Sequence, residues 1–296
     1  MRTLKDPTLL RQQAYIDGEF VGDGSTPVVN PATGERIASV PDFGSREAEQ
    51  AVEAAARAFK PWAARTAKDR SAILRRWFDL ILANREDLAT ILTSEQGKPF
   101  AEALGEIDYA ASYVEFYAEE AKRPNIESVT SHLPDAEVEV WREPVGVAAL
   151  ITPWNFPSAM LTRKAAAALA AGCTAVAHPS AETPYSALAL AELAERAGLP
   201  AGVFNVVTGH APTVVEPWTR DTRVRALSFT GSTEIGRLLY RQSADTVKKL
   251  VMELGGHAPV DRLWLAPGFV PLLRLQHHPD GEHGRGEAPQ EANIHR

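Results

Sequence analysis

From residue 146 onward the chain alternates between short apolar runs and amphipathic stretches, and this rhythm limits the possible folds more than any other feature. Strands that alternate with helices form right-handed βαβ units around a parallel sheet. We therefore expect an α/β fold with a parallel five-stranded sheet and flanking helices. The predicted strands are residues 146–152, 174–178, 203–207, 226–230 and 248–254, and the helices between them lie near residues 158–171, 184–197, 212–218 and 232–243.

The chain before residue 146 has a different organisation. Residues 14–41 have the pattern of short strands with turns, including a hairpin around Asp17-Gly18, and four helical patterns follow up to Lys122. Ser45 and Thr66 are suitable N-caps for the first two of these helices. Residues 124–144 form a predicted protruding β-hairpin, because residues 137–141 alternate polar and apolar side chains. Its exposed edge predicts a homo-oligomer.

Composition excludes several classes of protein. The formal net charge of -7 argues against a nucleic-acid-binding protein. No apolar run approaches the roughly 20 residues of a membrane span, and the first residues lack the apolar core of a signal peptide. The single cysteine, Cys173, rules out an internal disulfide and fits a reducing, cytoplasmic setting.

Polar and glycine residues gather where the predicted strands end. Ligands of open parallel sheets bind beyond the carboxyl ends of the strands. Those ends carry Asn155, residues 178–180, Thr208-Gly209, residues 230–232 and residues 253–256. The sequence therefore predicts one binding site at this edge of the sheet.

The loop from Ile151 to Pro157 contains one uncharged amide, Asn155, between two prolines that stiffen the backbone. An amide held on a stiff loop can donate a hydrogen bond to a ligand oxygen. The alternative is a rigid turn in which Asn155 only caps its own backbone. The heptapeptide alone leaves both interpretations open.

Two further strand ends carry residues that suit ligand binding or catalysis. Residues 229–236 place small residues where a strand turns into a helix, and the free amides of a helix start suit a phosphate; a simple tight turn is the alternative. Glu253 ends an apolar strand, and in a half-buried position its pKa would be raised, as suits a general base. The alternative is an exposed strand-end glutamate.

Arg163 and Lys164 are adjacent on one predicted helix, so their side chains cannot both face one direction. One of them can bind an anionic substrate, while the other binds the cofactor or packs structurally. Two solvated surface charges are the alternative.

Three motifs in this order and spacing resemble the aldehyde dehydrogenase superfamily. They are Pro153-Trp-Asn-Phe-Pro157, Phe229-Thr-Gly-Ser-Thr-Glu-Ile-Gly236 and Glu253-Leu-Gly-Gly256. Residues 94–99, 106–111 and 151–164 are similar to the succinate-semialdehyde branch. The resemblance runs from about residue 10 to residue 260. It implies a Rossmann-like cofactor-binding domain formed by residues 1–123 and 145–260, an oligomerisation hairpin at residues 124–144, and oxidation of an aldehyde, most simply succinate semialdehyde, by NADP or NAD.

The resemblance also assigns residue roles. Asn155 is the side-chain donor of the oxyanion hole, Glu253 the base that activates the hydrolytic water, and Lys164 lies near the catalytic centre and cofactor. Arg163 matches the arginine that binds the substrate's distal carboxylate. The implied cofactor-binding residues are Ile151, Thr152, Pro153, Trp154, His178, Ser180, Ala181, Gly209, Thr230, Gly231, Ser232, Leu254 and Gly255. No metal site is expected.

The chain departs from the family pattern at several points. The family's nucleophilic cysteine lies beyond the Glu-Leu-Gly-Gly motif, and Cys173 matches a non-catalytic, buried family cysteine. Residues 261–296 do not continue the strand-helix pattern, so we expect a disordered tail and a shifted reading frame or truncated gene. His178 replaces a lysine and weakens a ribose contact, whereas Ala181 replaces a glutamate and permits NADP.

Further departures follow Gly209. Pro212 and Val215 stand where the family favours glycine, which would impair nucleotide binding, and Pro217 is expected to end a helix.

Three hypotheses follow. The chain is an incomplete dehydrogenase that cannot turn over substrate without its thiol, or a non-catalytic nucleotide-binding or assembly module derived from one, or a decayed product that folds poorly.

Overall fold

The computed structural model of the chain describes residues 2–123 and 126–256. Residues 1–255 belong to one compact unit. The predicted disorder of residues 261–296, and the predicted end of the cofactor-binding domain at residue 260, lie outside the described residues.

A parallel sheet forms the centre of this unit, as the alternation of strands and helices predicts. The strand order is β11-β10-β7-β8-β9-β1-β2, and the first five of these strands are parallel neighbours. All residues of β7 and β8 are buried, which explains why both appear in the sequence as unbroken apolar runs. The parallel strands are β7 (Val147–Ile151), β8 (Thr174–His178), β9 (Phe204–Val206), β10 (Val224–Thr230) and β11 (Lys249–Glu253).

Two antiparallel strands extend the predicted five-stranded sheet to seven. The predicted hairpin around Asp17-Gly18 is confirmed as β1 (Ala14–Ile16) and β2 (Glu19–Val21), and β1 pairs with β9. Asp17 and Gly18 both have positive φ, 56° and 83°, as a tight two-residue hairpin requires. The amide of Asp17 donates to the buried side chain of Asn205 on β9, which fixes the hairpin to the sheet.

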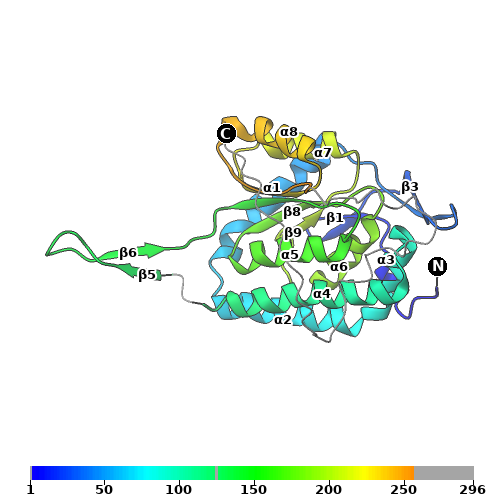
Figure 1. Cartoon of the computed structure of the whole chain (residues 1–296), viewed down its shortest axis with the longest axis horizontal. Coiled ribbons are helices and arrows are strands. Elements are labelled where there is room, and N and C mark those ends of the chain that lie inside the picture. Colours follow the sequence, from blue (N-terminus) through cyan, green and yellow to red (C-terminus); the bar gives the residue numbers. More distant parts are fainter. Residues whose placement is uncertain (1, 124–125, 257–296) are drawn as a thin grey trace, which may run out of the picture. The chain divides into compact units, whose positions relative to one another are not determined.

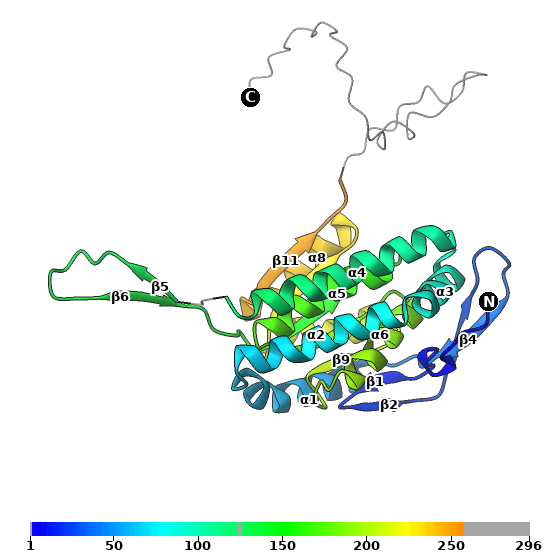
Figure 2. The ribbon, with the colours of Figure 1, turned by 90° about the horizontal axis from the view of Figure 1, so that it is seen from below.

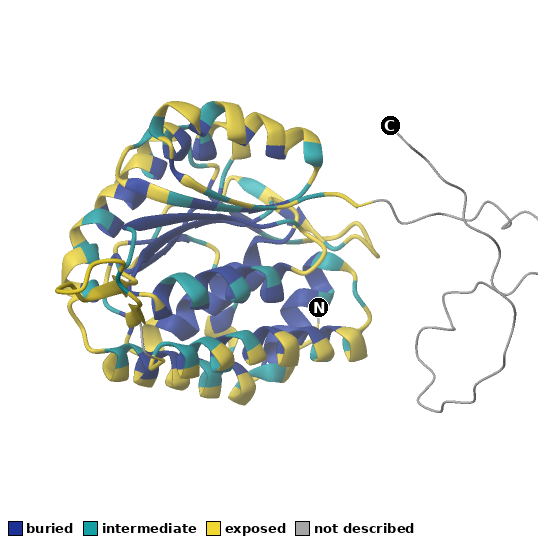
Figure 3. Ribbon diagram, turned by 60° about the vertical axis from the view of Figure 1, so that its left-hand side comes forward, coloured by how far each residue is buried: buried dark blue, intermediate teal, exposed yellow. Residues whose placement is uncertain are grey.

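Helices cover both faces of the sheet (Figure 1). Helices α1, α7 and α8 lie on one face, and α5 and α6 pack on the other, where α2 and α4 form an outer layer against them (Figures 1 and 2). The buried residues concentrate between these layers (Figure 3). The helices are α1 (Ser45–Ala63), α2 (Ala67–Ala83), α3 (Arg85–Gln96), α4 (Phe100–Glu120), α5 (Pro157–Ala170), α6 (Pro184–Arg196), α7 (Ala211–Arg220) and α8 (Thr233–Ser243), with short 3₁₀ turns η1 (Pro7–Leu9) and η2 (Ala244–Thr246).

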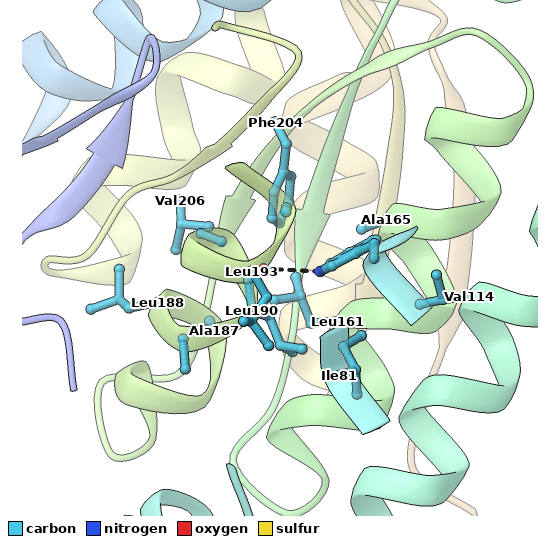
Figure 4. Packing of buried hydrophobic residues seen from close by; sticks show 14 of the residues in the cluster. Ile81, Val114, Leu161, Ala165, Ala187, Leu188, Leu190, Leu193, Phe204 and Val206 are labelled. Carbon is cyan, nitrogen blue, oxygen red and sulfur yellow. Dashed lines mark hydrogen bonds between the residues drawn. The ribbon is translucent and has the colours of Figure 1, made fainter. Parts of the chain in front are cut away.

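The core between the sheet and α5 and α6 consists of interlocking aliphatic and aromatic side chains. Leu161, Leu190 and Phe204 pack together in it (Figure 4). The indole N–H of the buried Trp77 donates to the carbonyl of Leu190 at 3.1 Å, so this large ring leaves no unpaired donor.

Two helix predictions are wrong. Helix α7 does not end at Pro217 but continues to Arg220. Trp218 is fully buried and its indole donates to the carbonyl of Ala48 on α1, and this packing outweighs the loss of one helical hydrogen bond. Thr66 caps α2 as predicted, whereas α1 is capped at Gly44, and Ser45 is its first residue.

Two pairs of strands stand apart from the main sheet. Strands β3 (Thr26–Val29) and β4 (Arg36–Val40) pair with each other, and so do β5 (Ile126–Val129) and β6 (Val138–Trp141). The β5–β6 pair is the predicted hairpin, and every residue of both strands is exposed.

Candidate functional site

The carboxyl ends of four parallel strands meet at one edge of the sheet. Ile151 at the end of β7 is paired with His178 on β8 and with Phe229 on β10, and Thr230 is paired with Glu253 on β11. The loops that follow these strands therefore leave the sheet side by side, as the sequence predicts.

The loop after β7 presents Asn155 at the surface. The side-chain Oδ1 of Asn155 accepts a hydrogen bond from the Phe156 amide at 3.1 Å, and Asn155 and Trp154 are both exposed. The predicted alternative, in which Asn155 caps its own backbone, is thus present. It leaves the NH₂ end of the amide as the free donor, so the two interpretations are compatible.

Two buried glutamates near this edge were missed as functional residues. Glu106 on α4 accepts from the amide of Ser158 at 3.0 Å, and Glu95 on α3 accepts from the amides of Tyr185 and Ser186, both at 2.7 Å. These amides belong to the first turns of α5 and α6, so each glutamate caps a helix from another element. Burial raises the pKa of Glu95 to about 8.

A sequence signal for these caps exists. Phe156 and Pro157 occupy the N-cap and first positions of α5, and neither side chain can accept a hydrogen bond from the first turn. A buried helix start without its own cap requires an acceptor from elsewhere.

Arg163 and Lys164 point to different partners, as their adjacency on a helix requires. Lys164 is buried and its Nζ donates to the hydroxyl of Ser228 on β10 at 2.9 Å. Burial lowers the pKa of Lys164 to about 8. The guanidinium of Arg163 pairs with Glu253 and lies 5.8 Å from the ring centre of Tyr113.

The predicted half-burial of Glu253 is wrong. Its side chain is 52% exposed, because β11 is the edge strand of the sheet. The carboxylate pairs with Arg163 and accepts from the hydroxyl of Thr230 at 3.2 Å. The Glu253 carboxylate therefore lies at an exposed position with two polar partners.

The turn at residues 230–232 directly precedes helix α8. The Ser232 side chain caps the helix by accepting from the Ile235 amide at 3.3 Å. The Gly231 amide donates to the carbonyl of Glu253 at 3.0 Å, so it is not free for a ligand. Gly236 is a packing glycine, since a Cβ there would lie 2.5 Å from the side chain of Leu254.

At the same edge of the sheet, the ends of β8 and β9 border a cavity of about 290 Å³. Gly209 has a φ of 140°, and a Cβ there would lie 2.1 Å from the carbonyl of Phe43, so close backbone contact requires glycine. The hydroxyl of Ser180 donates to the carboxylate of Glu182, a residue that the sequence interpretation did not include. The cavity is lined by Thr26, Val40, Pro41, Asp42, Pro179, Ser180, Ala181, Pro184, Thr208, Gly209 and His210.

His178 lies beneath this edge rather than on it. Its side chain is buried and its Nδ1 is 2.9 Å from the carbonyl of Val207, which makes Nδ1 the protonated nitrogen of the neutral ring. Burial lowers the pKa of His178 to about 4. The side chain of the predicted ribose contact is therefore turned into the protein.

The remaining predicted positions follow the strand ends. Ile151 and Thr152 are buried, and the Thr152 amide donates to the carbonyl of His178 at 3.2 Å. Leu254 is partly buried against α8, while Gly255 is exposed. Cys173 is 5% exposed at the junction of α5 and β8, in agreement with a structural thiol.

Over the described ranges 2–123 and 126–256, no cluster of three or more potential metal ligands occurs. In the same part of the chain no helix is long and apolar enough to span a membrane.

The sequence of this chain is similar to those of known semialdehyde dehydrogenases. The chain is 58% identical over 259 residues to a glutarate-semialdehyde dehydrogenase of Pseudomonas putida, covering 86% of this chain and 54% of that protein. It is 55% identical to the NADP(+) succinate-semialdehyde dehydrogenase of Escherichia coli, with the same coverage. It therefore spans about half the length of the curated relatives it matches.

The fold of this chain also matches solved structures of related proteins. A crystal structure of an Escherichia coli NADP-dependent enzyme matches with a TM-score of 0.85 and 55% identity, over 86% of this chain and 54% of that one. Betaine aldehyde dehydrogenase from Staphylococcus aureus in complex with NAD+ matches with a TM-score of 0.81 and 35% identity, over 83% and 50% of the two chains. Residues 20–260 match the family model described as the aldehyde dehydrogenase family. The chain belongs to the aldehyde dehydrogenase family.

Proposed function

We propose that this chain carries the cofactor-binding part, residues 1–123 and 145–260, of an NAD(P)+-dependent dehydrogenase for semialdehydes that bear a second, acidic group. The observation that carries the proposal is the position of Arg163. Its guanidinium lies at the edge of the sheet where the loops of the predicted site emerge, against Glu253 and the ring of Tyr113.

The residues at this edge fit a dinucleotide. Among the first amides of α8, that of Ile235 is bound by the Ser232 side chain, and those of Thr233 and Glu234 suit the pyrophosphate. The N-termini of α5 and α6 are already occupied by Glu106 and Glu95. The cavity beside Ser180 and Ala181, about 290 Å³, is close to the lower end of the range for small-molecule sites, about 300–1,000 Å³, and suits one nucleoside.

Either NADP or NAD is compatible with the proposal. Position 181 itself does not repel a 2′-phosphate, because Ala181 carries no carboxylate. Asp42 lines the same cavity, and the Glu182 carboxylate accepts from the hydroxyl of Ser180. The nicotinamide, when bound, supplies the acceptor for a hydride.

The substrate class follows from Arg163 and from the names of the relatives. Those names include glutarate, succinate and aspartate semialdehydes and 3-sulfolactaldehyde, each of which joins an aldehyde to an acidic group. The Arg163 side chain is 28% exposed, so a substrate carboxylate can reach it and replace Glu253. Succinate semialdehyde is the substrate we propose first.

Three residues would assist the reaction. The NH₂ group of Asn155 would donate to the oxygen that gains negative charge, and removal of such a donor typically costs about 100- to 1,000-fold in rate. Glu253, once released by Arg163, would accept a proton from the attacking water. Lys164, with its lowered pKa and its hydrogen bond to Ser228, would form the buried base of the site.

We do not expect this chain alone to oxidise an aldehyde, because its single thiol, that of Cys173, is buried between α5 and β8. The test combines the purified chain with succinate semialdehyde and NADP+ and follows NADPH. Clear turnover would overturn the expectation. A parallel calorimetric titration with NADP+ should saturate, and its failure to do so would overturn the cofactor-binding proposal.

A second candidate is an assembly module that pairs through the residue 124–144 hairpin, without catalysis. The observation that favours it is the number of large apolar side chains that the hairpin exposes: Ile126, Val129, Leu133, Val138, Val140 and Trp141. Sedimentation of the chain, and of a variant with charged residues at Val138 and Val140, would show whether these side chains hold copies together. A broad, non-cooperative melt would instead favour a decayed product.

A further inference from the structure

A buried ion pair lies between helix α4 and the loop that carries Asn155. Lys98 precedes α4, and its Nζ is 2.5 Å from Oε2 of Glu106. The side chain of Glu106 is 0% exposed and that of Lys98 is 10% exposed. Because buried charges are costly unless they are paired and hydrogen-bonded, each of these groups holds the other in place.

Both members of the pair also bind the segment around the loop. The Nζ of Lys98 donates to the carbonyl of Asn155 at 3.0 Å. The Oε1 of Glu106 accepts from the amides of Ser158 and Ala159, at 3.0 and 3.4 Å. The chain is therefore held at Asn155 itself and at the first turn of α5.

Phe156 connects this anchor to the Asn155 side chain. The Nζ of Lys98 lies 3.7 Å from the centre of the Phe156 ring, a favourable position for a cation. The amide of the same Phe156 donates to Oδ1 of Asn155 at 3.1 Å. The residue that packs on Lys98 thus orients the Asn155 amide through its Oδ1 and leaves the NH₂ group as the end available for a ligand.

We propose that Lys98 and Glu106 are positioning residues for Asn155. Glu106 fixes the start of α5, while Lys98 fixes the backbone of Asn155 and the ring of Phe156, so that the Asn155 amide presents its donor end to the site. The inference rests on the proposed function, in which Asn155 stabilises the negatively charged oxygen. Neither Lys98 nor Glu106 touches substrate or cofactor in this account.

Hydrogen exchange of the Phe156 amide measures this positioning directly. The loop is exposed, so this amide is protected chiefly by its bond to Asn155. The experiment uses the full ¹⁵N-labelled chain with Lys98→Met, which removes the donor to Asn155 but leaves Glu106 able to accept from Ser158. We expect the Phe156 amide to exchange at least about tenfold faster, as the loss of a charge-assisted contact implies, and Lys98→Arg to restore most of the protection.

Glu95→Gln is the matched control. Glu95 is also buried and caps α6 through the amides of Tyr185 and Ser186, and neither of these hydrogen bonds involves the Asn155 loop. We expect Phe156 exchange in Glu95→Gln to equal that of the unmodified chain. Unchanged exchange in Lys98→Met, or equal acceleration in Glu95→Gln, would overturn the proposal.

A second variant covers the case in which Lys98→Met does not fold. Lys98→Gln keeps a neutral donor, and we expect it to accelerate Phe156 exchange by a smaller factor; no acceleration would again overturn the proposal. The measurement uses neither cofactor nor aldehyde, so its outcome is distinct from that of the NADP+ titration.

Discussion

The buried ring of His178 should make the stability of this protein depend on pH. The ring is 3% exposed and neutral, with a pKa lowered from 6.5 to about 4 by burial. In the unfolded chain the ring is protonated below about pH 6.5. Between pH 6.5 and about 4 the unfolded state therefore binds more protons, and the free energy of unfolding falls as the pH falls.

The size of this effect follows from the two pKa values. A pKa difference of one corresponds to about 1.36 kcal/mol, so the fall from 6.5 to about 4 is worth about 3 kcal/mol in total. About 2 kcal/mol of this should be lost between pH 7.5 and pH 5. Glu95, whose pKa is raised to about 8, acts in the opposite direction, because its folded form holds a proton that the unfolded chain releases.

A comparison with His178→Asn removes the contribution of Glu95. Asparagine can place an amide N–H near the position of Nδ1 and keep the bond to Val207, but it does not titrate. Urea unfolding followed by circular dichroism at pH 7.5 and 5 gives the loss for each protein. We expect the unmodified chain to lose about 2 kcal/mol more than the variant. Equal losses, or a His178 resonance that titrates near 6.5, would refute the reasoning.

Three further predictions concern folding and the thiol. Leu188→Ala, at a fully buried position, should lower the free energy of unfolding in urea by about 2–5 kcal/mol. Leu238→Ala, at a position 42% exposed on α8, should change this free energy by less than about 0.5 kcal/mol. Equal effects of the two substitutions would contradict the assigned core. Pro217→Ala should stabilise the chain by about 1–2 kcal/mol, because the helix continues through this position; a loss of stability would mean that it does not. Cys173 should react with a colorimetric thiol reagent only after unfolding, and rapid reaction of the native chain would contradict its 5% exposure.

The sequence predicted those parts of the structure that depend on local pattern. The five parallel strands and the helices between them begin and end within about two residues of their expected bounds. The gathering of strand ends also follows from pattern alone, because parallel strands with right-handed crossovers place all their carboxyl ends at one edge.

What the sequence missed depends on contacts between distant segments. Glu106 and Glu95 act on amides 52 and 90 residues away, so no local spacing reveals them. Pro217 lies in a helix because Trp218 is anchored to α1, and packing of this kind overrides local propensity. Glu253 is exposed because β11 lies at the edge of the sheet, a position that a strand's own residues do not specify.

The central claim is that the carboxyl ends of β7, β8, β9, β10 and β11 form one nicotinamide-dinucleotide site. Titration of the ¹⁵N-labelled chain with NADP+, followed by amide chemical shifts, tests it most directly. We predict saturable changes confined to residues 151–155, 180–181, 209–210, 230–234 and 254–255. No saturable change, or changes confined to the opposite edge of the sheet, would contradict the claim.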